Sequence, residues 1–149
     1  MNAADNLVFV DTNVLLYELD GADPAKQLAS RRWLDALWQE GTARVSWQVL
    51  NEFYVNATRK TGVPAATCRR LVETYLLWKP AEFSLPLLWR AWYWTDHSAI
   101  SYWDALILAA AERSGCRWLL SEDFSHGRKY GSVQVVNPFR SDPGEFFGG

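Results

Sequence analysis

The sequence predicts an α/β protein, a three-layer α/β/α sandwich around a central, mostly parallel sheet. Short apolar runs alternate with segments of helical periodicity that are ten or more residues long, which is typical of strands joined by crossover helices. The chain has 149 residues, of which 49% are hydrophobic, and this is enough to fill one core. Since no repeat or linker interrupts it, we expect a single domain over residues 1–149.

The first half of the chain begins with a strand and continues with clearly delimited helices. Asp23 is a favoured N-cap residue, Pro24 stands at the first helical position, and Gly41 follows the last turn of the same segment. We expect strands at 7–10 and 43–46, and helices at 13–20, 23–41 and 47–62.

Proline and glycine also delimit the elements of the second half. Pro64 and Pro86 open helical segments, and Gly115 ends another. We expect helices at 65–78, 86–97 and 102–115, and strands at 81–85, 117–120 and 133–136. The Gly-rich segment 143–149 is expected to be a flexible tail.

Charge and cysteine content exclude several classes of protein. The formal net charge is −2, so any grip on a polyanion must be local. Cys68 and Cys116 form no C-x-x-C pair, which argues against a zinc knuckle or a disulfide scaffold and favours a reducing cytoplasm. The N-terminus has no basic segment before an apolar run, and about eighteen consecutive apolar residues occur nowhere, so we expect a soluble, untargeted protein without membrane contact.

Nine tryptophans are many for this length. Several apolar residues with helical spacing predict one face that packs into the core: Leu85, Leu88, Trp89, Trp92 and Tyr93. Trp47, Trp78 and Trp94 lie off the apolar stripes, and we expect them at protein interfaces. Stacking on unpaired bases is the competing use of an exposed tryptophan.

Two acidic residues stand shortly after predicted strands. Asp11 ends the apolar run "VFV", and Asp123 follows "RWLL" after two further residues. Because ligands of open parallel sheets bind beyond the carboxyl ends of the strands, the two carboxylates form a candidate site. Carboxylate oxygens suit Mg²⁺ or Mn²⁺, and such an ion can activate water against a phosphodiester.

Five segments in order resemble the motifs of PIN-domain nucleases, in particular the VapC toxins of bacterial toxin–antitoxin modules. They are "VFVDTNVLLY", "SWQVLNEFY", "SYWDALILAAA", "LLSEDFSHG" and "VQVVNPF", which together span residues 7–139. The resemblance implies a PIN-like fold and metal-dependent endoribonuclease activity, with Mg²⁺ or Mn²⁺ as cofactor. It also implies an RNA substrate, a cognate VapB-like antitoxin and a homodimer.

The resemblance also assigns site residues. Asp11, Glu52, Asp104 and Asp123 match the catalytic and metal-binding acids. Asn13 and Ser121 match the small polar positions that orient water or the ligating carboxylates. Two questions stay open: Glu122 is a rival ligand beside Asp123, and His126, Arg128 and Lys129 could either contact a phosphate or form a solvated turn.

Each acid also has a simpler interpretation. Asp11 could only cap the following helix, and Asp104 with Ser101 fits the capping-box pattern. Glu52 lies beside the apolar stripe of its helix and could be solvated, while Asp123 could belong to a turn. Their ordered occurrence, each within its own hydrophobic frame, favours the site.

Basic residues occur in pairs on several predicted helices. Three helical pairs could supply a local positive field: Arg31 and Arg32, Arg59 and Lys60, Arg69 and Arg70.

Two other functions are alternatives to a nuclease. A haloacid-dehalogenase-like phosphatase also starts with a strand that ends in Asp. It needs a second Asp two residues later, where this chain has Asn13. A catalytically silent PIN-like binding module is the other alternative.

Overall fold

A five-stranded sheet separates two layers of helices in the computed structural model, which describes residues 6–147. The strand order is β2-β1-β3-β5-β4. The strands are β1 (Val8–Val10), β2 (Ala43–Arg44), β3 (Trp118–Leu120), β4 (Lys129–Tyr130) and β5 (Val133–Val136). All neighbours pair in parallel except β4, which is antiparallel to β5, so the predicted mostly parallel sheet is confirmed.

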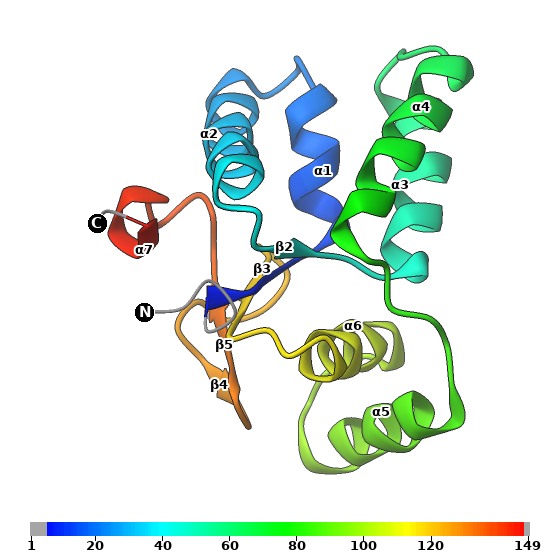
Figure 1. Ribbon diagram of the computed structural model, residues 1–149, viewed down its shortest axis with the longest axis vertical. Coiled ribbons are helices and arrows are strands. Elements are labelled where there is room, and N and C mark those ends of the chain that lie inside the picture. The colour runs from blue at the N-terminus through cyan, green and yellow to red at the C-terminus, as the bar shows by residue number, and fades with distance from the viewer. Residues whose placement is uncertain (1–5, 148–149) are drawn as a thin grey trace.

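The helices cover both faces of the sheet, as the predicted sandwich requires (Figure 1). They are α1 (Thr12–Leu19), α2 (Pro24–Glu40), α3 (Trp47–Lys60), α4 (Ala65–Tyr75), the 3₁₀ turn η2 (Leu76–Trp78), α5 (Leu85–His97), α6 (Tyr102–Arg113) and α7 (Gly144–Phe147). In Figure 1, α1 to α4 lie above the sheet and the pair α5 and α6 lies below it. Within residues 6–147 no helix is long and apolar enough to span a membrane.

The strands of the sheet differ from the predicted strands at two places. Residues 81–85 form no strand; Ala81 makes only a single parallel bridge with Ser46, because β2 is short and Ser84 already caps α5. Strand β4 was not predicted. It pairs Tyr130 with Val133 across a two-residue turn in which Gly131 has φ +60°, a conformation that glycine adopts without steric cost.

The side of α5 that is buried differs from the predicted one. Leu87, Ala91 and Trp94 are the buried residues of this helix, so Trp94 belongs to the core. Four of the five residues that were predicted for the core are exposed: Leu85, Trp89, Trp92 and Tyr93. Because α5 is apolar around most of its circumference, periodicity could not identify the side that packs against α6.

Two further tryptophans test the interface prediction. Trp78 is buried and packs against Trp38 with a 35° tilt between the rings and 4.3 Å between their centroids, so it is a core residue. Trp47 is 36% exposed, as expected for a residue outside the core. The prediction was therefore wrong for Trp78 and Trp94, whose large rings fill the space between helices.

The C-terminal segment contains a helix that the sequence did not predict. Residues 144–147 form α7, where flexibility had been expected, whereas residues 148–149 lie outside the described residues. The ring of Phe146 packs against Trp33 at 5.5 Å and against Trp118 at 5.3 Å. These contacts fix the segment to α2 and to the sheet.

Phe146→Ala should therefore lower the free energy of unfolding by about 1–3 kcal/mol, less than a fully buried Phe would cost because the ring is only half-buried. Urea denaturation measures the loss. Phe83→Ala is the matched control, since Phe83 is 56% exposed and should change little. Equal stabilities of the two variants would show that α7 does not hold the fold together.

The topology creates a site at one end of the sheet. Strands β1 and β3 are fully buried and adjacent, and the chain leaves them toward opposite edges of the sheet. The strand order therefore reverses between β1 and β3, and a crevice opens beyond their carboxyl ends. Asp11 follows β1 and Ser121 follows β3 at this point.

Candidate active site

Asp11 is held by its neighbours on both central strands. Its backbone N–H donates to the carbonyl of Leu120 on β3, and its side chain is 4% exposed. It is also the N-cap of α1 and accepts from the Thr12 N–H at 2.7 Å. The carboxylate that caps α1 is therefore fixed in place at the end of β1.

Ser121 and Asn13 connect Asp11 to Asp123. The buried Ser121 hydroxyl donates to Asp11 Oδ2 at 2.7 Å and accepts from the Asp123 N–H at 3.0 Å. The Asn13 amide donates to Asp11 Oδ2 at 3.3 Å and to Asp123 Oδ2 at 3.1 Å. Residues more than a hundred positions apart thus share one hydrogen-bond network, and both small polar residues hold the acids in place.

The other two acids reach the site from helices. Glu52, on α3, accepts from the Thr12 hydroxyl at 2.9 Å, so it is anchored next to Asp11. Asp104 lies in the first turn of α6, where its N–H donates to the Ser101 hydroxyl at 3.1 Å. The predicted cap at Ser101 is present, and it places the carboxyl of Asp104 at the crevice.

All four acids line a single cavity of about 230 Å³. Its wall is formed by Asp11, Thr12, Asn13, Leu16, Gln48, Glu52, Asn56, Lys60, Trp103, Asp104, Ile107 and Asp123. We call this cavity the acidic pocket. Four carboxyl groups face one basic side chain, so the pocket favours protons or cations.

The electrostatics of the pocket raise two pKa values. Burial raises the pKa of Asp11 to about 7; hydrogen bonds from Ser121 and Thr12 oppose this shift, and the charges of Asp123 and Asp104 add to it. The pKa of Asp104 is raised as well, first by burial and then by Asp123 and Glu52. The negative charge of each neighbouring acid therefore contributes to the raised pKa values, as expected for carboxylates that lie close together.

Removing the Ser121 hydroxyl should raise the pKa of Asp11 further, because the charged carboxylate loses a buried donor. We expect the carboxyl carbon of Asp11 to titrate at higher pH in Ser121→Ala than in the unchanged protein, measured by ¹³C NMR. Ser125→Ala, an exposed serine of the following loop, is the control. An unchanged titration in Ser121→Ala would show that this hydrogen bond does not stabilise the ionised form.

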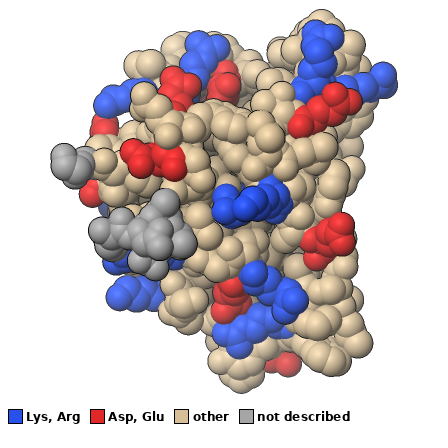
Figure 2. Space-filling model, in the orientation of Figure 1, with Lys and Arg blue, Asp and Glu red and all other residues tan. Residues whose placement is uncertain are grey.

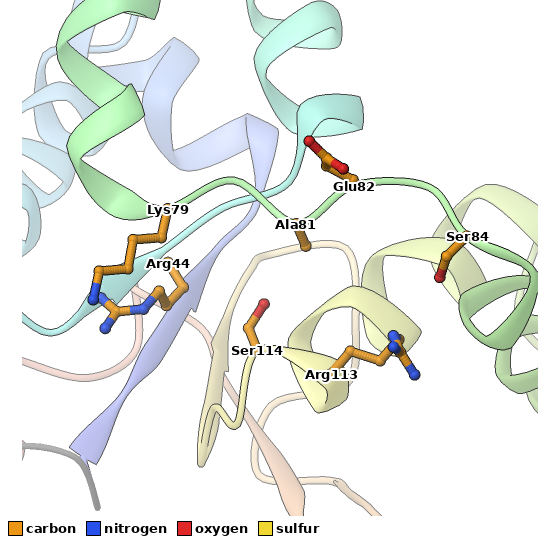
Figure 3. A pocket seen from close by; sticks show the side chains of 7 residues that line it. All are labelled: Arg44, Lys79, Ala81, Glu82, Ser84, Arg113 and Ser114. Carbon is orange, nitrogen blue, oxygen red and sulfur yellow. The ribbon is translucent and has the colours of Figure 1, made fainter.

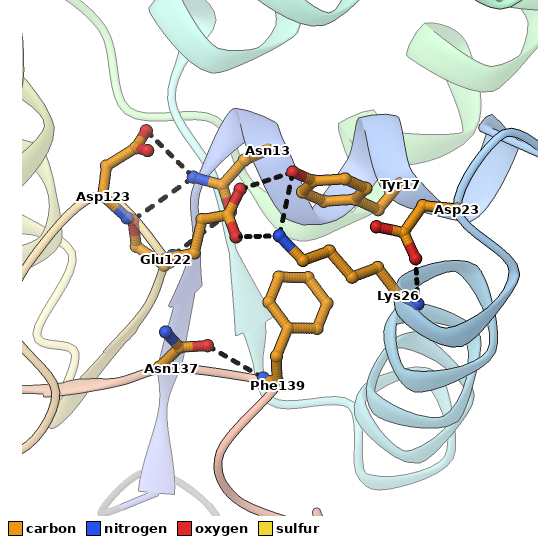
Figure 4. Close-up of polar contacts among 9 residues, drawn as sticks. Asn13, Tyr17, Asp23, Lys26, Glu122, Asp123, Asn137 and Phe139 are labelled. Carbon is orange, nitrogen blue, oxygen red and sulfur yellow. Dashed lines mark hydrogen bonds and ion pairs between the residues drawn. The ribbon is translucent and has the colours of Figure 1, made fainter.

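Glu122 is turned toward a different partner. Its carboxylate accepts from the Tyr17 hydroxyl at 2.6 Å and pairs with Lys26 Nζ at 2.8 Å (Figure 4). Lys26 also lies over the ring of Phe139, 5.0 Å from its centroid. Glu122 lines a second cavity, of about 190 Å³, and is not part of the acidic pocket wall. Between the two neighbouring acids, the structure brings Asp123 into the network with Asn13.

The remaining basic candidates lie elsewhere, apart from one. His126 accepts from the Asn137 N–H at 3.0 Å, and Arg128 lies over the Tyr130 ring at 4.8 Å. Neither they nor Lys129, in β4, line the acidic pocket, so a phosphate contact by this loop stays a prediction. Of the six paired helical cations, Lys60 lines the pocket.

A larger cavity, of about 440 Å³, has the opposite character. Its wall contains three basic residues, Arg44, Lys79 and Arg113, and one acidic residue, Glu82 (Figure 3). Figure 2 shows one face of the molecule, with Lys and Arg side chains near its centre and in its lower part. This cavity shares no residue with the acidic pocket, so it does not supply the local positive field expected around the acids.

Sequence reasoning missed three residues of the site. Thr12 anchors Glu52, Trp103 lies on the wall, and Gln48 donates to the Trp103 carbonyl at 3.3 Å. Thr12 and Trp103 each stand next to a predicted acid, which was the available signal. Gln48 belongs to the helix of Glu52, but the side of that helix that faces the site could not be chosen from sequence; for the same reason Lys60 could not be singled out among the six paired cations.

The oxygen atoms that line the acidic pocket are of the kinds that a hard divalent cation binds. They are carboxylate, amide and hydroxyl oxygens, which Mg²⁺ and Mn²⁺ prefer. In the part of the chain that the structure describes, however, no three or more Asp, Glu, His or Cys side chains form a group that could hold a metal ion. The acids share a pocket but are held mainly by hydrogen-bond donors, and closer approach of their oxygens would be needed to bind an ion.

The fold and the pocket define an α/β protein with an acidic site at the switch point of a parallel sheet. The family model of the PIN domain matches residues 8–131, and the chain therefore belongs to the PIN domain family.

Known structures agree with this fold. The crystal structure of VapC20 from Mycobacterium tuberculosis, a sarcin-ricin loop cleaving toxin, matches with a TM-score of 0.60 and 22% sequence identity. The match covers 78% of this chain and 91% of that one, so the two proteins share their fold over most of their length. A search of curated protein sequences found no match.

Proposed function

We propose that this protein is a metal-dependent endoribonuclease and the toxin of a toxin–antitoxin pair. The observation that carries the proposal is the convergence of Asp11, Glu52, Asp104 and Asp123 on one pocket beyond the carboxyl ends of β1 and β3. Membership of the PIN domain family and the shared fold with a toxin that cleaves the sarcin-ricin loop support it. An RNA substrate is consistent with a cytoplasmic location.

In the proposed mechanism, Asp11, Asp104 and Asp123 would hold Mg²⁺ or Mn²⁺, and Glu52 would either join them or orient the attacking water. When bound, such an ion lowers the pKa of water and neutralises charge on the phosphate oxygens. Ser121 and Asn13 keep the Asp11 carboxylate turned toward the pocket. Water attacks phosphorus in line with the leaving 3′ oxygen, which gives a 5′ phosphate and a 3′ hydroxyl.

Purified protein incubated with total cellular RNA tests the proposal. Cleavage is expected with Mg²⁺ or Mn²⁺ and none with EDTA, and mapping of the cut ends would identify the RNA. Release of phosphate from small monoesters, with a trapped phospho-aspartate, would instead show a haloacid-dehalogenase-like phosphatase. RNA binding without cleavage under all metal conditions would indicate a silent binding module.

We also propose a homodimer and a VapB-like antitoxin as protein partners. An exposed apolar face on α5 supports a protein interface: Leu85, Trp89, Trp92 and Tyr93 are 41–57% exposed. Light scattering of the purified protein at several concentrations tests for the dimer, and copurification with the product of a neighbouring gene tests for the antitoxin.

A further inference from the structure

Trp103 occupies an unusual place at the edge of the acidic pocket. It directly precedes Asp104 on α6, lines the pocket and is 62% exposed. Its backbone carbonyl accepts from the buried Gln48 amide at 3.3 Å, and its ring contacts Tyr102 at 5.7 Å between centroids. The backbone beneath the ring is therefore tied to α3, while most of the indole surface faces solvent beside the acids.

Lys60 is the basic residue in the wall of the same pocket. It is an exposed residue of the last turn of α3, and within residues 6–147 it is the only Lys or Arg on the pocket wall. None of the ion pairs found among the described residues involves it. Its ammonium group is therefore available to an anion, in a pocket whose other ionisable groups are acids.

The acidic pocket continues into the cavity beside Tyr17. The two cavities have volumes of about 230 and 190 Å³, and they share Asn13, Leu16 and Lys60 in their walls. The two cavities are therefore adjacent at Lys60, whereas Trp103 lines the acidic pocket and not the second cavity.

We propose that Trp103 and Lys60 position the substrate of the proposed nuclease. Trp103 stacks on an unpaired base next to the scissile phosphate, and Lys60 contacts a neighbouring phosphate. An aromatic face offers stacking to any base that is not already stacked, and a single lysine offsets some of the repulsion between phosphates and the acids. This site therefore takes single-stranded or looped RNA in preference to duplex. The inference rests on the proposed function and adds two positioning residues.

Steady-state kinetics on a short unstructured RNA oligonucleotide and on the same strand in a perfect duplex test the proposal. We expect faster cleavage of the unstructured strand. Trp103→Ala should raise KM by roughly 10-fold, in line with the loss of one base-stacking contact, with a smaller change in kcat. Trp103→Phe should retain most of the affinity, since an aromatic face remains. Phe83→Ala is the exposed aromatic control outside both cavities.

Lys60→Ala should weaken binding by an amount that depends on salt. The slope of log KM against log salt concentration should fall by about 0.7, the value for one phosphate contact on a single strand. Arg59→Ala, on the same turn but absent from the pocket wall, should leave this slope unchanged. A slope that falls equally in both variants would overturn the role of Lys60.

The outcomes separate this inference from the proposed function. If the unchanged protein cleaves RNA but Trp103→Ala behaves like Phe83→Ala, or duplex is preferred, the positioning role is wrong and the nuclease stands. If the protein cleaves no RNA, tryptophan fluorescence of the unchanged protein and of Trp103→Phe, each titrated with the same oligonucleotide, still tests the stack. Equal quenching in both would overturn it, and would leave a protein partner as the occupant of the Trp103 surface.

Discussion

Asp11→Asn is expected to reduce RNA cleavage by at least about 100-fold and to leave the fold intact. Substitutions of groups that only orient a metal ligand cost about 10–100-fold, so loss of a ligand charge should cost more. Asn has nearly the same shape as Asp, and its one oxygen can still accept from the Thr12 N–H, while its amide group takes the place of the oxygen that accepts from Ser121. The measurement is the initial rate of RNA cleavage with Mg²⁺, alongside circular dichroism of both proteins.

Asp35→Asn is the matched control, because it makes the same chemical change at an exposed position of α2. It should cleave RNA at the rate of the unchanged protein. Comparable cleavage by Asp11→Asn and by the unchanged protein would remove Asp11 from the catalytic machinery, and with it the central support for a nuclease site in this pocket.

The same substitution is expected to stabilise the protein at and above neutral pH. Burial disfavours the charge of Asp11 and raises its pKa from the ordinary 3.8 to about 7 in the folded protein. Between these values the folded state binds more protons than the unfolded state, so stability falls as the pH rises from about 4 to 7 and then levels off. About 4 kcal/mol is the upper bound of this loss, at 1.36 kcal/mol per pH unit.

Asn cannot ionise, so Asp11→Asn avoids the loss. Its unfolding temperature should exceed that of the unchanged protein by a few degrees at pH 8, and the difference should shrink toward pH 5. The measurement is thermal unfolding in EDTA, because a bound cation would stabilise the ionised carboxylates. A difference that stays constant over pH 5–8 would show that Asp11 does not titrate in this range.

The candidate site was predictable because its residues follow local rules. Asp11 and Asp123 stand just beyond β1 and β3, and Asp104 occupies the first turn of a capped helix. These positions can be read from short windows of sequence. The placement of Glu122 could not be read in this way. Its preference for Lys26 and Tyr17 depends on α1 and α2, which lie about a hundred residues earlier in the chain.

The sequence by itself determined the α/β class, most helices and strands, and the acids that end up in one pocket. Tertiary structure decided which side of α5 is buried, where Trp78 and Trp94 pack, and that residues 144–147 form a helix held by Phe146. It also decided that Trp103 and Lys60 border the acids. The physical reason is that caps and periodicity depend on neighbours in sequence, whereas burial and charge pairing depend on partners that only folding brings together.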